Sequence, residues 1–322
     1  MTTDAWVISN RRTARLSHAL RRPEIASSAF LVLLVVLLSM TVPAFRTSGN
    51  LQGVISTVAV TGVVALAVNQ VILCGEIDIS TGSNLGLTAA VAGAVAVRTG
   101  GVVAPLAAAL AAGLVVGTVN GLLSTAARIP SIIVTLGTLS IIRGGLLDKW
   151  GGTVFNPPHS SQLLGGGVTS IVILLLVALV FGFLNSHTTW GRNVFAVGGN
   201  PRAAKLAGLS AGRVQIFCFI GVGLCVGLAS MIYLGQVGQI QATAGTGFEL
   251  QAIAAVVVGG TSITGGRGST VAPLVGAVLI GVILNALTLL GVAGTWQDLV
   301  VGALILLAIS ADVVRRRILG EF

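Results

Sequence analysis

Long runs of apolar residues, separated by short polar or Gly- and Pro-rich segments, follow one another along almost the whole chain. A helix needs about 20 mainly apolar residues to cross the hydrocarbon core of a bilayer. By this measure the pattern predicts about ten crossings, at 27–44, 51–73, 82–97, 102–126, 131–147, 168–185, 212–234, 250–263, 270–290 and 296–313. The runs 82–97 and 250–263 are short for a full crossing, so we expect broken or re-entrant helices there.

The composition also indicates a membrane protein. Only 8% of the 322 residues are charged, against about a quarter in soluble domains, while 54% are apolar and 44 are glycine. A soluble fold and a disordered chain are both excluded, because each needs more polar or charged residues. The expected fold is an all-α polytopic membrane protein. Close helix contacts are predicted by glycines four residues apart, at Gly113, Gly117 and Gly121, at Gly82 and Gly86, and at Gly223 and Gly227.

The basic residues predict the orientation of the chain. With both termini and alternate loops in the cytoplasm, the inner side receives most of the cations: Arg11, Arg12, Arg15, Arg21, Arg22, Arg128, Arg192, Arg202, Lys205, Arg213, Arg267, Arg315, Arg316 and Arg317. The outer side receives only Arg46, Arg98 and Lys149, as the positive-inside rule requires. The net charge of +9 therefore indicates membrane topology and not nucleic-acid binding.

The predicted organisation is a basic cytoplasmic segment at 1–26, a membrane domain at 27–314 and a cytoplasmic tail at 315–322. The first segment is expected either to lie as a short helix on the anionic inner leaflet or to form a disordered tail. The first apolar run could pass for the core of a signal peptide. Its leader is long and the rest of the chain is equally apolar, so we expect an uncleaved first helix.

The sequence contains no Walker lysine motif, no Gly-x-Ser-x-Gly elbow and no His-Glu-x-x-His. Cys218 and Cys225 would lie about 10 Å apart along one helix, too far for a disulfide, and the histidines are scattered. We therefore expect no metal, cofactor or enzymatic activity in this chain, and a transport pathway is the most economical function. Polar side chains at membrane depth then become informative, since each is costly unless it is buried in protein or lines water.

The densest polar cluster, at 75–83, reads Gly-Glu-Ile-Asp-Ile-Ser-Thr-Gly-Ser. In an extended chain Glu76, Asp78 and Ser80 share one side, which must face a cavity or partner groups. In a helix Glu76 and Ser80 would share a face and Asp78 would oppose them, a less coherent polar surface. The alternative is a solvated cytoplasmic loop in which Asp and Ser cap the next helix.

A second polar cluster, at 259–269, includes Thr261 and Ser262 and is similar to the first, which suggests a weak internal repeat. Broken helices in corresponding places of two halves often form the substrate site of a transporter. Single polar residues at depth are further candidates for the pathway: Asn69, Gln70, Asn120, Thr135, Thr138 and Asn285. Each could bind a hydroxylated solute or join two helices, and the second role is the more common for any one alone. Arg143 either snorkels from the end of a crossing or belongs to the pathway, and we expect the first.

The longest inward loop, 186–211, contains a short helix with clear end signals. Asn200 is the predicted cap, Pro201 takes the first helical position, and Gly208 ends about two turns. Two turns do not persist alone in water. The segment, with its Ala203–Ala204 patch beside Arg202 and Lys205, therefore suits docking into a groove of another protein, and the alternative is a helix lying on the membrane. The predicted docking residues are Asn200, Pro201, Arg202, Ala203, Ala204, Lys205, Leu206 and Gly208.

At these residues the chain resembles the ribose-type, or simple-sugar, permease subunits of ATP-binding cassette importers. Four blocks carry the resemblance: 75–83, which is similar to the family's Gly-Gly-Ile-Asp-Leu-Ser-Val-Gly segment; 135–138 with Arg143-Gly144; 191–209; and 247–269. It covers about residues 28–315. Glu76 stands where the family more often has glycine, so the substrate and the local backbone geometry can differ here.

The resemblance implies a type II importer fold in a bacterial inner membrane, with two permease subunits, identical or not, around one central path. It implies a cytoplasmic ATP-binding subunit, often a fused double cassette that holds the ATP and magnesium, and a periplasmic or lipoprotein solute-binding protein outside. By the same resemblance 200–208 is the coupling helix, and Asp78 and Ser80 belong to the polar segment near the pathway. Transport would follow alternating access driven by the ATP-binding subunit.

One rival function is an ion-coupled secondary carrier that uses Glu76 and Asp78 as a proton or sodium site. A membrane enzyme or lipid flippase is more distant. The solute is expected to be a pentose, hexose, polyol or furanosyl signal molecule. Because only 5% of the residues are aromatic, and stacking platforms are expected in a high-affinity sugar site, we expect a weakly binding path whose specificity lies in the delivering protein.

Overall fold

The computed structural model describes residues 23–318. Most of the predicted basic N-terminal segment, with Arg11, Arg12, Arg15, Arg21 and Arg22, lies outside the described residues, as do the last residues of the predicted tail. The α-helices are α2 (Pro23–Thr41), α3 (Ser48–Leu73), α4 (Thr81–Thr99), α5 (Val103–Thr125), α6 (Ser131–Trp150), α7 (Gly167–His187), α8 (Thr189–Gly199), α9 (Pro201–Leu206), α10 (Ala211–Val237), α11 (Phe248–Gly259), α12 (Ala272–Leu289) and α13 (Gly294–Ile318). Three short 3-10 helices, η1 (Pro43–Arg46), η2 (His159–Ser161) and η3 (Leu163–Gly165), and the strands β1 (Val154–Phe155) and β2 (Ile240–Gln241) complete the described part.

Eight helices in the described part are long and apolar enough to cross a membrane: α2, α3, α5, α6, α7, α10, α12 and α13. An all-α polytopic membrane fold is thereby confirmed. The first begins at Pro23, before the predicted start at 27, and the last continues to Ile318, past the predicted end at 313.

The other two predicted crossings, 82–97 and 250–263, contain α4 and α11, and a non-helical segment precedes each helix. Residues 76–79 have no regular structure and lead from α3 into α4, and residues 242–247 lead from β2 into α11. Since α11 has only 12 residues, it cannot span the membrane alone. The prediction of broken helices at these two places therefore agrees with the structure.

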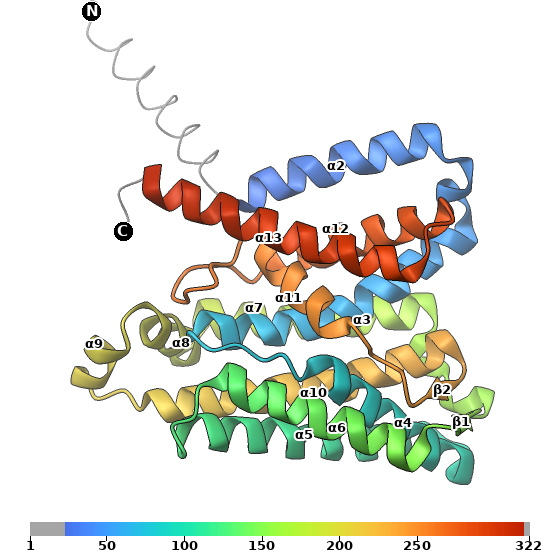
Figure 1. Cartoon of the computed structure of the whole chain (residues 1–322), viewed down its shortest axis with the longest axis horizontal. Helices are drawn as coiled ribbons and strands as arrows, with labels where there is room; N and C mark the ends of the chain where they lie inside the picture. Colours follow the sequence, from blue (N-terminus) through green and yellow to red (C-terminus); the bar gives the residue numbers. More distant parts are fainter. Residues whose placement is uncertain (1–22, 319–322) are drawn as a thin grey trace, which may run out of the picture.

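The crossing helices run along the long axis of the molecule, and together with α4 and α11 they alternate in direction (Figure 1). The short helix α9, the start of α2 and the end of α13 lie at one end, and the antiparallel β1–β2 pair lies at the other. The α9 end carries Arg128 and Arg267 between helices, Arg192, Arg202 and Lys205 on α8 and α9, and Arg213 in the first turn of α10. The opposite end carries Arg46 on η1, and Arg98 and Lys149 in the last turns of α4 and α6. The cations are thus gathered at one end of the described part, as the predicted topology requires.

The tightest helix pair is α5 with α10, and glycines on both helices bring the backbones together. A Cβ atom added at Gly113 would lie 2.1 Å from the carbonyl oxygen of Gly223, and one at Gly227 would lie 2.6 Å from that of Ala109. The predicted role of these glycines in helix packing is confirmed. Gly82 and Gly86 pack differently, because the backbone that their added Cβ atoms would meet is the non-helical segment 242–247, at the carbonyls of Gly245 and Ala244.

We predict that Gly223→Ala lowers the melting temperature of the purified protein in detergent. The new methyl group would lie 2.0 Å from the carbonyl oxygen of Gly113, so the two backbones must separate, at a cost of about 1–3 kcal/mol. Gly221→Ala on the same helix is the matched control, since nothing lies within 4 Å of its added Cβ. Equal melting temperatures for the two variants would contradict this account of the α5–α10 contact.

Candidate functional site

Four of the predicted pathway residues form one chain of hydrogen bonds inside the molecule. The hydroxyl of Thr138 on α6 donates to Asn120 Oδ1 on α5 at 2.7 Å, and Asn120 Nδ2 donates to Ser80 Oγ at 2.8 Å. The backbone N–H and hydroxyl of Ser80 both donate to Asp78 Oδ1, at 2.9 and 2.7 Å. The network connects the residues before α4 with α5 and α6. Polar groups in the membrane interior need such partners within the protein, because lipid offers no hydrogen bonds.

The position of each residue in this network shows how the segment before α4 is built. Asp78 and Ser80 are buried while Ile77 and Ile79 are half-buried, so the two polar side chains share the inner side of a non-helical segment. The solvated-loop alternative is wrong for Asp78 and Ser80. Glu76 stands apart from them at the end of α3, where Gln215 Nε2 donates to its Oε1 at 2.7 Å.

A second network joins α3 to the loop that connects α11 with α12. The hydroxyl of Thr261 donates to Asn69 Oδ1 at 2.7 Å, and Asn69 Nδ2 donates to the carbonyl oxygen of Ser269 at 3.1 Å. Asn69 and Thr261 are both buried. Ser262 lies in the same loop, with its hydroxyl 3.2 Å from that of Thr264. These residues fasten the loop to the last turn of α3.

The suggested internal repeat paired the wrong segments. Residues 75–83 lead into the N-terminus of a helix, whereas residues 259–269 follow the C-terminus of α11. The structural counterpart of the first cluster is 242–247, because it also enters the N-terminus of a short helix. The segments 75–83 and 259–269 contain similar residue types because Gly, Ser and Thr are favoured at both ends of a helix. This similarity in sequence led to the wrong pairing.

The remaining pathway candidates lie apart from these networks. Asn285 on α12 and Asn50 on α3 exchange two amide hydrogen bonds of 2.7 and 3.0 Å, which join these helices. Thr135 donates to the carbonyl of Ser131 in its own helix. Gln70 is buried, and neither of its side-chain polar atoms has a hydrogen-bond partner in the described part of the chain.

Helices α4 and α11 meet at their N-terminal ends, where the first turn of α4 lies against the start of α11. A Cβ atom added at Gly82 would lie 2.5 Å from the carbonyl of Gly245 and 1.8 Å from Glu249 Oε2. The Glu249 carboxylate therefore lies against the N-terminal turn of α4 while it belongs to the first turn of α11. Both helix dipoles favour negative charge at this point. Glu249 Oε2 is buried without a hydrogen-bond partner among residues 23–318.

Arg143 supports this meeting point, and the prediction that it snorkels is wrong. Its Nη1 donates to the carbonyl oxygens of Ala242 and Ala244, at 3.0 and 2.9 Å. Those carbonyls belong to the non-helical segment before α11 and have no helical partner. One guanidinium thus satisfies two backbone acceptors at membrane depth, since a planar cation with five N–H donors can serve several acceptors.

Two acidic residues near this point were missed by the sequence analysis. Glu249 precedes the apolar run at 250–263, and Asp298 lies inside the run at 296–313. A Cβ atom added at Gly247 would lie 3.2 Å from Asp298 Oδ1, which brings α13 beside the start of α11. The available signal was an isolated carboxylate at the edge of an apolar run or inside it.

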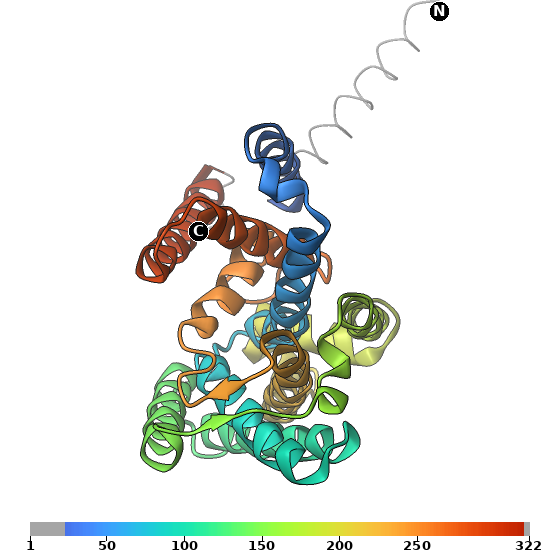
Figure 2. The ribbon, with the colours of Figure 1, turned by 90° about the vertical axis from the view of Figure 1, so that its right-hand side faces the viewer.

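These elements lie along one side of the molecule. Seen from the end opposite α9, helices α13, α11 and α6 follow one another along that side (Figure 2). These helices expose large apolar side chains, such as Ile133 and Ile141 on α6 and Leu299 and Leu306 on α13. Asp298 is also exposed. A carboxylate is costly against lipid, so this side suits contact with protein or a water-lined path rather than lipid alone.

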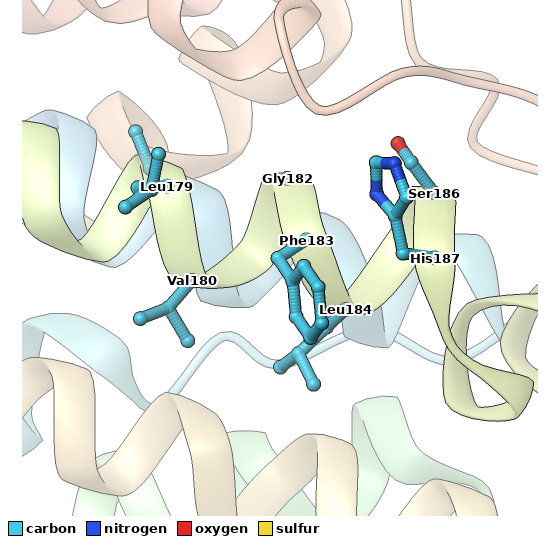
Figure 3. Close-up of a pocket in the computed structure, with 8 residues that line it drawn as sticks. Leu179, Val180, Gly182, Phe183, Leu184, Ser186 and His187 are labelled. Carbon is cyan, nitrogen blue, oxygen red and sulfur yellow. The ribbon is translucent and has the colours of Figure 1, made fainter.

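A recess along α7 has a different character. Its lining is almost entirely apolar, and it includes Leu179, Phe183 and His187 on the outer face of that helix (Figure 3). The rings of Phe183 and His187 stack with centroids 5.5 Å apart. None of the polar networks described above reaches this surface, so lipid chains are its natural neighbours in a membrane.

The predicted docking segment is a helix with the expected ends. Asn200 Oδ1 accepts a hydrogen bond from the N–H of Ala203 at 3.0 Å, Pro201 begins α9, and Gly208 has a φ of 80°. Arg202, Ala203, Lys205 and Leu206 are exposed, and Leu206 keeps 90% of its surface. Ala204 is instead buried against the body of the molecule. The preceding helix α8, capped by Thr188, was not predicted.

No group of three or more His, Cys, Asp or Glu side chains that could hold a metal ion occurs among the described residues. Cys74 and Cys218 are buried and Cys225 is half-buried, and all three are free thiols.

Comparison with known proteins gives consistent matches over most of the chain. The family model described as branched-chain amino acid transport system / permease component matches residues 50–309. The ribose import permease protein RbsC of Escherichia coli is 36% identical over 292 residues, which cover 88% of this chain and 91% of that protein. RbsC of Bacillus subtilis is 38% identical (88% and 90% covered), and the L-arabinose ABC transporter permease protein AraH of Azospirillum brasilense is 37% identical (89% and 86%). No solved structure matches.

We predict that Arg143→Met lowers the melting temperature of the purified protein in detergent. The substitution leaves the carbonyls of Ala242 and Ala244 without their donor, and an unsatisfied buried acceptor costs about 1–3 kcal/mol. The control is Arg98→Met, which removes an exposed cation from the last turn of α4. If both variants melt at the same temperature, Arg143 does not hold the non-helical segment.

Proposed function

The chain belongs to the family of branched-chain amino acid transport system permease components, and we propose that it forms the translocation pathway of an ATP-binding cassette importer for a small hydroxylated solute. One observation carries this proposal. A capped, exposed docking helix lies at the end of the molecule that carries most of the described cations, while interrupted helices meet at membrane depth. The chain itself is a transport subunit, and ATP hydrolysis belongs to a separate subunit.

The solute path follows the side formed by α6, α11 and α13. Two copies of this permease, or this chain and a paralogue, face one another across that side, which gives Asp298 and the exposed apolar residues of α6 and α13 a protein or aqueous environment. The meeting point of α4 and α11 lies behind it. There Thr138 connects the surface to the buried network of Asn120, Ser80 and Asp78. Interrupted helices are a recurrent way to present polar groups to a solute within the membrane.

The solute is a sugar or a related polyol. Relatives of this chain are named for ribose, arabinose and fructose, which all carry several hydroxyl groups and no charge. The pathway candidates are mostly amides and hydroxyls, and each can both donate and accept hydrogen bonds to such groups. Weak binding suits a path whose solute must leave again.

The exposed face of α9 docks into the ATP-binding subunit, which we propose to be a fused double cassette. Leu206 offers a large apolar side chain, and Arg202 and Lys205 flank it with positive charge. An exposed leucine with almost all of its surface in solvent is costly unless a partner covers it. The partner groove is therefore expected to be apolar at its centre and acidic at its rim.

The same arrangement sets the orientation. The α9 end, rich in cations, faces the cytoplasm of a bacterium, together with both chain termini. The opposite end, with the β1–β2 pair, faces the solute-binding protein that delivers the sugar. Closure of the cassettes on ATP moves α9, and the crossing helices repack so that the path opens first to one side and then to the other.

An ion-coupled carrier built on Glu76 and Asp78 is not favoured. Gln215 engages Glu76 at the cytoplasmic end of α3, and Ser80 donates two hydrogen bonds to Asp78. Both carboxylates are thus engaged by other side chains of the molecule, and Asp78 is buried.

Uptake in proteoliposomes distinguishes the two mechanisms. The permease, its ATP-binding subunit and the solute-binding protein are reconstituted together, and labelled ribose, arabinose and fructose are supplied outside. We expect accumulation that requires the enclosed ATP and the binding protein. Uptake driven by a pH or sodium gradient without ATP would overturn the proposal.

For the docking helix we predict that Arg202→Glu combined with Lys205→Glu abolishes ATP-driven uptake while the permease remains folded. Reversed charge repels an acidic groove rim, so affinity for the ATP-binding subunit falls by at least about tenfold. Co-purification of the two subunits measures that loss. The control is Arg128→Glu with Arg213→Glu, an equal change of charge on exposed residues outside α9 at the same end. Normal co-purification and uptake of the α9 variant would contradict the assignment.

A further inference from the structure

Three segments that are far apart in the sequence meet through glycine backbones beside α9. They are the end of α3 at Leu73 and Gly75, the end of α8 at Gly198 and Gly199, and the middle of the α11–α12 loop at Gly265 and Gly266. We call this contact the glycine junction. Gly75, Gly265 and Gly266 have φ values of 87, 82 and 70°, a region that other residues rarely adopt.

The contacts at the glycine junction are between backbone atoms. The N–H of Gly266 donates to the carbonyl oxygen of Leu73 at 2.9 Å. A Cβ atom added at Gly198 would lie 1.8 Å from that oxygen and 2.8 Å from that nitrogen, so Gly198 sits directly over the hydrogen bond. A Cβ atom added at Gly266 would lie 2.5 Å from Gly199 Cα, and one at Gly265 would lie 3.0 Å from Gly75 Cα.

Each segment of the junction continues into an element of the proposed transport cycle. Gly199 is followed by Asn200, the cap of the docking helix α9. Gly75 leads through the non-helical residues 76–79 into α4. The loop with Gly265 and Gly266 begins where α11 ends and leads to α12. The junction thus brings the end of α8, which precedes the docking helix, against the two segments that lead into α4 and out of α11.

The loop is also held to α3 by side chains, so it moves with that helix. The Asn69 amide binds the hydroxyl of Thr261 and the carbonyl of Ser269, near the two ends of the loop. Asn185 on α7 donates to Thr270 Oγ1 at 2.9 Å. The α11–α12 loop is therefore fastened to α3 and α7 by side chains, and it meets α8 at Gly198 and Gly199 of the junction.

We propose that the glycine junction transmits the displacement of α9 to the two interrupted crossings, a role that rests on the proposed function of the chain. Direct backbone contact leaves no side-chain rotamers to absorb a shift, because a side chain can turn aside where a backbone cannot. Movement of the α8–α9 corner must then displace the Leu73–Gly266 hydrogen bond and, with it, the entry to α4 and the exit of α11.

A neighbouring pair of glycines provides a sharp test. Gly198→Ala places a methyl group on the Leu73–Gly266 hydrogen bond. In Gly199→Ala the nearest atom, Gly266 Cα, lies 4.0 Å from the added Cβ, which is an ordinary contact. Neither glycine has a positive φ, so backbone strain does not separate the two variants.

Both variants are purified with the ATP-binding subunit and reconstituted with the solute-binding protein, and labelled sugar uptake and ATP hydrolysis are measured in the same vesicles. For Gly198→Ala we expect retained co-purification and hydrolysis, with uptake per ATP reduced by about tenfold. Gly199→Ala should keep the wild-type ratio. A wild-type ratio in Gly198→Ala, or an equal loss in both variants, would overturn the proposal.

If Gly198→Ala does not assemble, Thr261→Val decides the question. It removes the hydroxyl that donates to Asn69 and adds no bulk, so it loosens the tie between the loop and α3 without touching α8. We expect a reduction of uptake per ATP by about fivefold with assembly intact, and an unchanged ratio refutes the proposal. Failure of the proposed function is a separate result, since the wild-type complex itself would then show no ATP-dependent uptake.

Discussion

Inside a membrane every backbone N–H and C=O group needs a partner within the protein, and this constraint governs the structure wherever a helix is interrupted. Uninterrupted helices satisfy it by themselves. The segments at 76–79 and 242–247 cannot, so the molecule supplies partners from other elements. Arg143 on α6 serves the carbonyls of Ala242 and Ala244, and Ser131 Oγ accepts from the N–H of Ile77 at 3.1 Å.

The same constraint explains why some helices are largely buried in the molecule while others are exposed at its surface. Helices α3 and α10 are largely buried, and they hold the interrupted segments in place. Glycines allow α5 to lie against α10, and Gly82 and Gly86 allow α4 to lie against the segment before α11. Helices α2, α7 and α13 expose most of their surface and suit lipid or a second permease. The buried polar networks are thus kept away from lipid.

The few charged side chains lie mainly in two regions of the molecule. Most cations of the described part lie at the α9 end, where we propose that they orient the protein and flank a docking helix. The charges at membrane depth, Arg143, Glu249 and Asp298, gather where α6, α11 and α13 approach one another. A path for a neutral sugar needs hydroxyls and amides more than charge, so these three residues are better explained as support for the interrupted backbone and the subunit contact.

The sequence by itself determined the features that depend on neighbouring residues. Apolar runs located the crossings and marked the two that are broken, while Asn200, Pro201 and Gly208 defined α9, since capping and backbone preference act within a few positions. The alternation around Asp78 and Ser80 indicated a segment with one polar side. Only the tertiary structure decided which distant groups meet: Thr138 with Asn120, Arg143 with two carbonyls, Glu249 with α4, and three glycine segments with one another. Helices such as α3 and α10 are apolar on every face, so no stripe in the sequence records how each is turned toward its neighbours.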